Sequence, residues 1–198
     1  SISVMKPYFF INFFIAHNLH QVFSCSILLR TPCKVNAFYA ILFAKDAFME
    51  NSMDENYEKR GYLLEDFRLF HLKDDRGTKV DYHYHEFCKI VLLLSGSGSY
   101  IVEGRRYLLL PGDVVLVGSR CVHKPEFEEG ISYERVILYI SPALLAESSA
   151  PDYSLEDIFS GQRGHVLRPT EDVRRRLRSL AEELEAEIAA SGGENIIL

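Results

Sequence analysis

The stretch His83-Tyr-His-Glu-Phe-Cys-Lys-Ile-Val-Leu-Leu-Leu-Ser-Gly-Ser-Gly-Ser-Tyr100 decides the fold of this chain. Two histidines precede an apolar run at residues 90–94, which stops at a glycine-rich turn. Short apolar runs between glycine turns are typical of strands that are buried on at least one face. Because residues two apart on a strand share a face, we expect His83, His85 and Lys89 to point the same way.

Outward from this stretch, short strands alternate with turns. Glu103-Gly104-Arg105 separates two apolar segments, and its glycine can adopt the positive φ of a tight hairpin. Pro111-Gly112-Asp113 is a second turn, because proline presets the first central torsion and glycine permits the second. The segments expected to form strands are 63–72, 80–94, 100–102, 106–110, 114–117 and 133–140, with an acidic loop at 126–130. So many short strands before any helix indicate an all-β sandwich or barrel.

The hydrophobic period changes after these strands. Pro142 is expected to start a short helix that ends near Ala146, since proline is tolerated in a first helical turn. One long helix is expected over residues 170–190. Thr170 can cap its beginning, and Gly192-Gly193 ends it.

One face of the long helix carries a narrow apolar seam with spacings of 4, 3 and 4 residues, which is typical of a coiled coil. Arginines crowd its N-terminal half and glutamates its C-terminal half, so both blocks oppose the helix dipole. An antiparallel partner would set one block against the other, which predicts a two-fold homodimer. The alternative is a helix that lies on its own barrel. The expected dimer interface comprises Val173, Leu177, Leu180, Leu184, Arg174 and Arg178.

The composition excludes several classes of protein. The chain has 198 residues, 47% of them hydrophobic and 25% charged, which is typical of a soluble globular protein of one domain or two small ones. A net charge of −6 repels the phosphate backbone of nucleic acid and argues against DNA binding within this chain. The four cysteines show no paired or zinc-like spacing, which favours reduced thiols in a cytoplasmic protein.

Residues 1–48 differ from the rest of the chain. They hold eight of the 13 phenylalanines and carry a charge of +3, against −9 for residues 49–198. Polar residues from His17 onward interrupt their apolar run before it reaches the length of a membrane span, and no signal-peptide cleavage site follows. We expect this atypical apolar N-terminal extension to lie outside the functional domain.

Three histidines add chemistry to the expected barrel. His83 and His85 stand at the head of one strand, and His123 follows the proline-glycine turn and a further strand. Three imidazoles that converge inside a barrel could hold a divalent metal ion. Glu86 cannot join them, because it points to the opposite face of a regular strand.

In order and spacing, these residues resemble the two motifs of the cupin family: His83-Tyr-His85, the Ser95-Gly-Ser-Gly98 turn, then Gly104, Pro111-Gly112-Asp113 and His123. The resemblance implies a cupin-like β-barrel, that is, a double-stranded β-helix or jelly roll. Lys89 stands where metal-binding cupins carry an acidic ligand. An ammonium about 4 Å from a metal ion would repel it by roughly 1–4 kcal/mol per unit of metal charge, so metal binding is disfavoured.

Within the cupins, the chain resembles the N-terminal sensor domains of AraC-type transcription regulators. The resemblance rests on residues 83–100, Val102-Glu-Gly-Arg-Arg-Tyr107, Leu110-Pro-Gly-Asp-Val114 and Val122-His-Lys124, followed by a long strand, a short helix and an amphipathic helix. In that family the barrel binds a small effector, the terminal helices dimerise, and a separate C-terminal domain with two helix-turn-helix motifs binds DNA. We therefore expect DNA to be reached only through such a domain, outside residues 1–198.

The resemblance implies a mainly β fold followed by a C-terminal α-helical dimerisation segment. Together with the composition of residues 1–48, it divides the chain into the extension at 1–48, an N-terminal arm at 49–66, an effector-binding barrel at 67–141 and the helical segment at 142–198.

The expected ligand site consists of His83, His85, Lys89 and His123, which offer hydrogen-bond donors and acceptors beside apolar walls. Lys89 favours an anionic or polyhydroxylated effector, such as an organic acid or a sugar. In the alternative interpretation, Lys89 extends to solvent and the histidines are structural. No catalytic residue, metal ligand or cofactor is expected.

Two functions follow from these interpretations. The first is a non-catalytic, cytoplasmic module that senses a small molecule and forms a homodimer in a transcription regulator. The alternative is a small metal-dependent cupin enzyme, such as a dioxygenase or an isomerase.

Overall fold

The computed structural model describes residues 57–150, 152–162, 164–190 and 196–197. The predicted extension at 1–48, the first part of the 49–66 arm and the Gly192-Gly193 helix stop lie outside the described residues.

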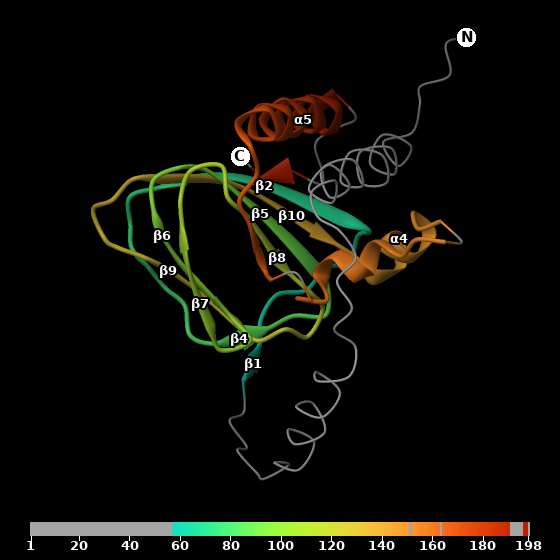
Figure 1. Cartoon of the computed structure of the whole chain (residues 1–198), viewed down its shortest axis with the longest axis horizontal. Helices are drawn as coiled ribbons and strands as arrows, with labels where there is room; N and C mark the ends of the chain where they lie inside the picture. Colours follow the sequence, from blue (N-terminus) through green and yellow to red (C-terminus); the bar gives the residue numbers. More distant parts are fainter. Residues whose placement is uncertain (1–56, 151, 163, 191–195, 198) are drawn as a thin grey trace, which may run out of the picture.

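Two six-stranded sheets face each other (Figure 1). The first sheet has the order β1 (Glu58–Lys59), β4 (His83–Tyr84), β9 (His123–Phe127), β6 (Gly98–Val102) and β7 (Arg105–Leu109), and β3 (Thr78–Lys79) also pairs with β9. The second sheet has the order β11 (Val166–Leu167), β8 (Val114–Val117), β5 (Cys88–Ser95), β10 (Tyr133–Ile140), β2 (Phe67–Asp74) and β12 (Ile196–Ile197). The β1–β4 and β12–β2 pairs are parallel, and the others are antiparallel.

The second sheet is covered on both faces, which explains the continuous apolar run in β5. Val91 and Leu93 belong to the core between the two sheets, whereas Leu92 and Leu94 belong to the core on the outer side. A strand buried on both faces needs apolar residues at successive positions rather than at alternate ones.

Helices cover the outer face of the second sheet (Figure 1). The short helix α4 (Pro142–Glu147) begins as predicted, with Ser141 Oγ accepting a hydrogen bond from the backbone N–H of Leu144 at 3.1 Å. A 3₁₀ helix, η2 (Leu155–Phe159), follows, and the long helix α5 (Glu171–Ala190) matches the predicted one to within a residue. Among the helices in the described part of the chain, none is long and apolar enough to span a membrane.

The apolar seam of α5 faces its own sheet. Leu177 and Leu184 are buried in the outer core with Ala181 and Ile188, and Val173 and Leu180 pack against the same core. The apolar residues of α5 therefore pack as the alternative interpretation expected, against the barrel of their own chain. A homodimer through this helix remains a prediction, and it would have to use the residues that point away from the sheet.

Part of the charge pattern on α5 is also satisfied within the chain. Arg175 pairs with Asp172 one turn earlier, and Arg174 Nη1 lies 3.9 Å from Glu171 Oε2. Arg178 Nη2 donates a hydrogen bond to the backbone carbonyl of Leu94 at 3.3 Å. The two predicted interface arginines, at 174 and 178, thus have partners in their own chain.

The predicted strand at 80–94 is two strands in the structure. β4 ends at Tyr84 in the first sheet, whereas β5 begins at Cys88 in the second. The intervening residues carry the chain from one sheet to the other. The residues before and after the crossing are both buried, so their hydrophobicity does not show where the chain passes from one sheet to the other.

Other boundaries also differ from the prediction. The first strand runs from Phe67 to Asp74 instead of over 63–72, and Glu126 and Phe127 belong to β9 rather than to an acidic loop. The strands at 114–117 and 133–140 match β8 and β10. β11 pairs with β8 and β12 pairs with β2, so the barrel does not end at residue 141.

Candidate functional site

The four residues predicted to form the ligand site lie together between the sheets. His83 and His123 are directly opposite each other in the β4–β9 pair, with ring centroids 4.2 Å apart. The ring of His85 lies 4.7 Å from that of His123, and Lys89 Nζ lies 3.1 Å from His123 Nε2. All four side chains are buried, with at most 6% exposure. Lys89 therefore does not extend to solvent.

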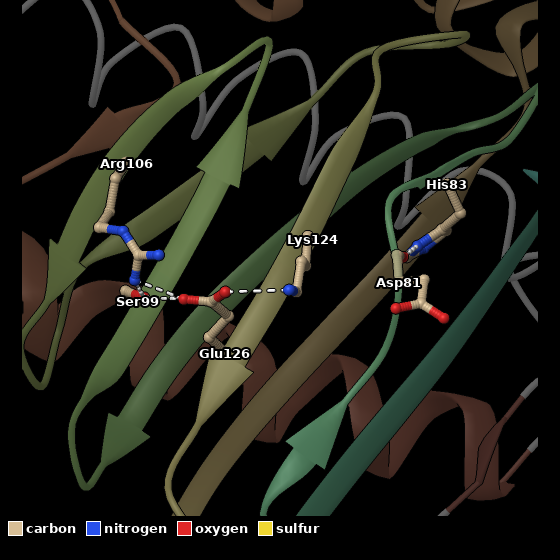
Figure 2. A network of polar contacts seen from close by, with 6 residues as sticks. All are labelled: Asp81, His83, Ser99, Arg106, Lys124 and Glu126. Atoms are coloured by element: carbon tan, nitrogen blue, oxygen red, sulfur yellow. Dashed lines mark hydrogen bonds and ion pairs between the residues drawn. The ribbon is translucent and has the colours of Figure 1, made fainter. Parts of the chain in front are cut away.

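Backbone carbonyls orient the three imidazole rings. Nδ1 of His83 lies 2.8 Å from the carbonyl oxygen of Asp81, as Figure 2 shows. Nδ1 of His85 lies 2.6 Å from the carbonyl of Phe87, and Nδ1 of His123 lies 3.0 Å from that of Cys121. A carbonyl only accepts, so Nδ1 carries the hydrogen, and Nε2 of each neutral ring is left as an acceptor.

Lys89 Nζ is the donor in the contact with His123, because Nε2 of that ring carries a lone pair. Burial, followed by the positive charge of Arg135, lowers the pKa of Lys89 to about 7. Nζ also lies 5.5 Å from the ring centroid of Tyr139. At neutral pH a large fraction of Lys89 is therefore an uncharged amine.

The imidazoles are uncharged as well. Burial and then the charge of Lys89 lower the pKa of His85 to about 3 and that of His123 to about 2. Burial also lowers the pKa of His83. Nε2 of His85 is buried and has no hydrogen-bond partner among the described residues. Such an atom is rare in folded proteins, and it marks a place where a ligand donor could bind.

The donor set does not suit a metal ion. The lone pair of His123 Nε2 is engaged by Lys89, and the position of an acidic ligand is taken by that same basic side chain. Within the described part of the chain, no group of three or more His, Cys, Asp or Glu side chains is placed to hold a metal ion. The residues of this cluster therefore do not fit a metal ion.

Three residues of the site were not predicted from the sequence: Tyr139, Arg135 and Tyr100. Tyr139 is paired with Lys89 across β10 and β5, and Arg135 lies four residues earlier on the same face of β10. The ring of Tyr100 on β6 is stacked on His123, with centroids 5.9 Å apart. Burial along β10 alternates only from Val136 to Ile140, and the residues of this strand show no polar–apolar alternation that could have identified the first two.

The inner faces of β2 and β10 are less tightly covered than those of β5 and β8. Phe70 and Ile137, a directly opposed pair on the inner face, are only partly buried, as is Tyr139 beside them. In contrast, Val91 and Val115 on β5 and β8 are almost fully buried. The side chains on this part of the inner face are thus partly accessible to solvent.

A second polar network lies on the outer side of the first sheet and is separate from the site (Figure 2). Glu126 Oε1 lies 3.1 Å from Lys124 Nζ, and its Oε2 accepts a hydrogen bond from Ser99 Oγ at 3.2 Å. Arg106 pairs with the same carboxylate. These contacts join β6, β7 and β9 from outside and so hold His123 in place on the inside.

Comparisons with solved structures found several cupin proteins that are similar to part of this chain. The barrel is similar to a cupin 2 conserved barrel domain protein from Salinispora arenicola (16% identity, TM-score 0.36, 43% of this chain and 72% of that one). It is also similar to a cupin protein from Bacteroides fragilis (17% identity, TM-score 0.33, 52% of this chain and 95% of that one). A third similar structure is KdgF from a Halomonas species (25% identity, TM-score 0.34, 38% of this chain and 69% of that one). No curated protein matches the chain.

The family follows from a sequence profile. The profile described as the AraC-like ligand binding domain matches residues 69–197, which include most of β2, all later strands, α4 and α5. The sequence predictions of a mainly β, cupin-like fold and of an AraC-type sensor domain are thereby confirmed. With its two facing sheets and its long C-terminal helix, this chain belongs to the AraC-like ligand-binding domain family.

Proposed function

We propose that this chain is the ligand-sensing and dimerisation part of a cytoplasmic AraC-type transcription regulator, and that it binds a small sugar or organic acid between its sheets. The observation that supports this most directly is the buried polar cluster. Lys89 Nζ offers hydrogen-bond donors, while His85 Nε2 offers an acceptor that the described residues leave unused.

The chemistry of the cluster suits a ligand with both kinds of polar group. A hydroxyl group can donate to His85 Nε2, which is an acceptor because the Nδ1 atom of that ring carries the hydrogen. A carboxylate or a second hydroxyl can accept from Lys89 Nζ. The flanking rings of Tyr139 and Tyr100 supply apolar surface for the carbon skeleton.

Two strands connect this cluster to α5. Lys89 and Tyr139 are paired on the inner face of β5 and β10. The next pair, Ile90 and Leu138, faces the outer core that contains the buried side of α5. A ligand that binds one arrangement of these strands more tightly than another changes the balance between two positions of the helix.

We also propose that α5 joins two copies of the chain through its exposed side, and that DNA is bound by a separate helix-turn-helix domain. Arg175 and Glu182 lie on this side, in the basic and acidic halves of the helix. In an antiparallel pair of helices, each half would face the oppositely charged half of the partner.

A thermal-shift screen of sugars and small organic acids tests the sensor proposal. We expect at least one compound to raise the melting temperature of the chain, and its effect to disappear in Lys89→Met and His85→Phe. Lys73→Met is the matched control, because Lys73 is exposed and should leave the effect unchanged. A compound that stabilises all four proteins equally, or a screen without any stabilising compound, would count against the proposal.

A further inference from the structure

We infer that Lys89 captures its ligand covalently, by forming an imine with the carbonyl carbon of a small metabolite, and that 2-oxo acids are the class that fits best. The inference rests on the proposed function, because it names the chemistry by which the same site would recognise an effector. It depends on three features of the site: an uncharged amine, a proton acceptor and a nearby cation.

Lys89 is an unusual lysine because it is buried without a carboxylate. Its residue exposure is 6%, and among the described residues no carboxylate oxygen lies within ion-pair distance of Nζ. A buried ammonium without a counterion is unfavourable, so the side chain sheds its proton more easily than a solvated lysine does. The neutral amine has a lone pair and is a nucleophile.

The neighbour of this amine is a proton acceptor. Nζ donates to His123 Nε2 at 3.1 Å, and the Nδ1 atom of that ring is held by the carbonyl of Cys121. This contact uses one N–H bond and leaves the nitrogen lone pair directed elsewhere. The residues whose titratable or charged groups line the same interior are His83, His85, Tyr100, Tyr139, Arg135 with its partner Asp74, and Arg68 with its partner Glu65.

The capture step balances without any further reactant. The lone pair of Nζ forms a bond to the carbonyl carbon, and the π electrons of the C=O bond move to the oxygen, which takes up a proton. His123 Nε2 can carry the proton from Nζ to that oxygen, since it is already bonded to Nζ. The resulting hydroxyl takes up the second proton of the nitrogen by the same route and leaves as water, a C=N bond forms, and no oxidant or reductant is needed.

The charge of the interior favours an acid. Arg135 is close enough for its charge to affect Lys89, and it reaches the interior from β10. Its Nη1 lies 2.9 Å from Asp74 Oδ2, which leaves further N–H donors on the guanidinium group. A carboxylate next to the reacting carbonyl would lie in the positive potential of Arg135, and that arrangement defines a 2-oxo acid.

Reductive trapping tests this inference. The chain is incubated at about pH 7.5 with pyruvate and sodium cyanoborohydride, and the modified lysines are identified by peptide mass mapping. Lactate serves as the matched ligand, because it keeps the carboxylate and lacks the carbonyl. We expect one pyruvate adduct at Lys89, formed more than about tenfold faster than at the exposed Lys73, because a lysine with a lowered pKa has the larger fraction of free amine.

Two variants accompany the measurement. Lys89→Met should lose the adduct, and Lys89→Arg should lose it while keeping a positive charge, with far-ultraviolet circular dichroism confirming that each is folded. The control variant Lys73→Met should form the adduct at Lys89 at the same rate as the unchanged chain. Labelling of Lys73 and Lys89 at equal rates, or no adduct at Lys89 at all, would overturn the inference.

The test separates this inference from the proposed function. Equal stabilisation by pyruvate and lactate, without an adduct, would overturn the covalent step and leave a sensor that binds acids reversibly. An adduct at Lys89, together with no stabilising compound in the thermal-shift screen, would support the capture chemistry and count against the sensor.

Discussion

Oε1 of Glu185 on α5 lies 2.9 Å from Nδ1 of His71 on β2. The other ring nitrogen of His71 lies 2.9 Å from Oε1 of Glu134 on β10. One imidazole thus connects the long helix to two strands of the second sheet. Burial opposes its protonation, but the two carboxylates together outweigh that effect and raise the pKa of His71.

This contact predicts a pH-dependent attachment of α5. The folded pKa of His71 is raised above 6.5, so its contribution to stability is complete below pH 6.5 and is lost as the pH rises through the folded pKa. We expect His71→Gln to lower the free energy of unfolding by about 0.5–1 kcal/mol at pH 6 and by less at pH 8.5. Urea denaturation at the two pH values measures this. An equal loss at both would show that the charge on His71 has no role.

The buried imidazoles predict the opposite pH dependence. His85 and His123, with pKa values of about 3 and about 2, stay neutral in the folded chain while the unfolded chain takes up protons below pH 6.5. Stability from each is therefore lost as the pH falls below 6.5, at roughly 1.4 kcal/mol per pH unit.

The measurement is the slope of unfolding free energy against pH between 6 and 5. His85→Phe should reduce that slope by the share of one histidine, because phenylalanine does not titrate and the site already stacks His85 on Phe87. An unchanged slope in the variant would contradict the assignment of His85 as a neutral buried ring.

The Pro111-Gly112-Asp113 turn depends on one carboxylate. Asp113 is fully buried, its Oδ2 accepts from the backbone N–H of Leu110 at 2.9 Å, and Arg168 donates to both of its oxygens at 3.1 Å. We expect Asp113→Ala to destabilise the chain by about 3 kcal/mol, because it leaves these donors unpaired. Arg168→Met should have a smaller effect, since Arg168 is 54% exposed. Thermal and urea denaturation compare the two, and a larger loss for Arg168→Met would contradict this account.

The proposed dimer predicts a charge-swap result. Glu182→Arg with Glu187→Arg places like charges in the expected helix pair and should weaken the dimer by about 1–3 kcal/mol. Adding Arg175→Glu should restore part of the dimer stability. Sedimentation equilibrium measures both, and a monomeric unchanged chain would contradict the dimer. Leu177 and Leu184 are unsuitable for this purpose, because each is part of the chain's own core.

The sequence was informative where one local pattern carries one structural meaning. The glycine at position 104 predicted the hairpin between β6 and β7, and both Gly104 and Glu103 adopt a positive φ there. The spacing of Pro111, Gly112 and His123 resembled the second cupin motif. Lys89 was located because it departs from the first motif, which contains His83 and His85.

The sequence was less informative where meaning depends on a distant partner. Arg135 and Tyr139 follow Lys89 by more than 40 residues, and only the pairing of β10 with β5 brings them to the same face. Likewise, the periodicity of α5 identifies an apolar side without identifying what covers it. The apolar side of α5 is covered by the sheet of its own chain. A partner helix in a coiled coil would require the same spacing of apolar residues.

β11 and β12 come from the last part of the chain, yet they hydrogen-bond to the two outermost long strands of the second sheet, β8 and β2. Without them, both margins of that sheet would present open rows of backbone donors and acceptors. Such margins are templates on which further chains can add strands. A truncation after residue 141 would therefore be expected to aggregate, even though most of the strands that surround Lys89 would still be present.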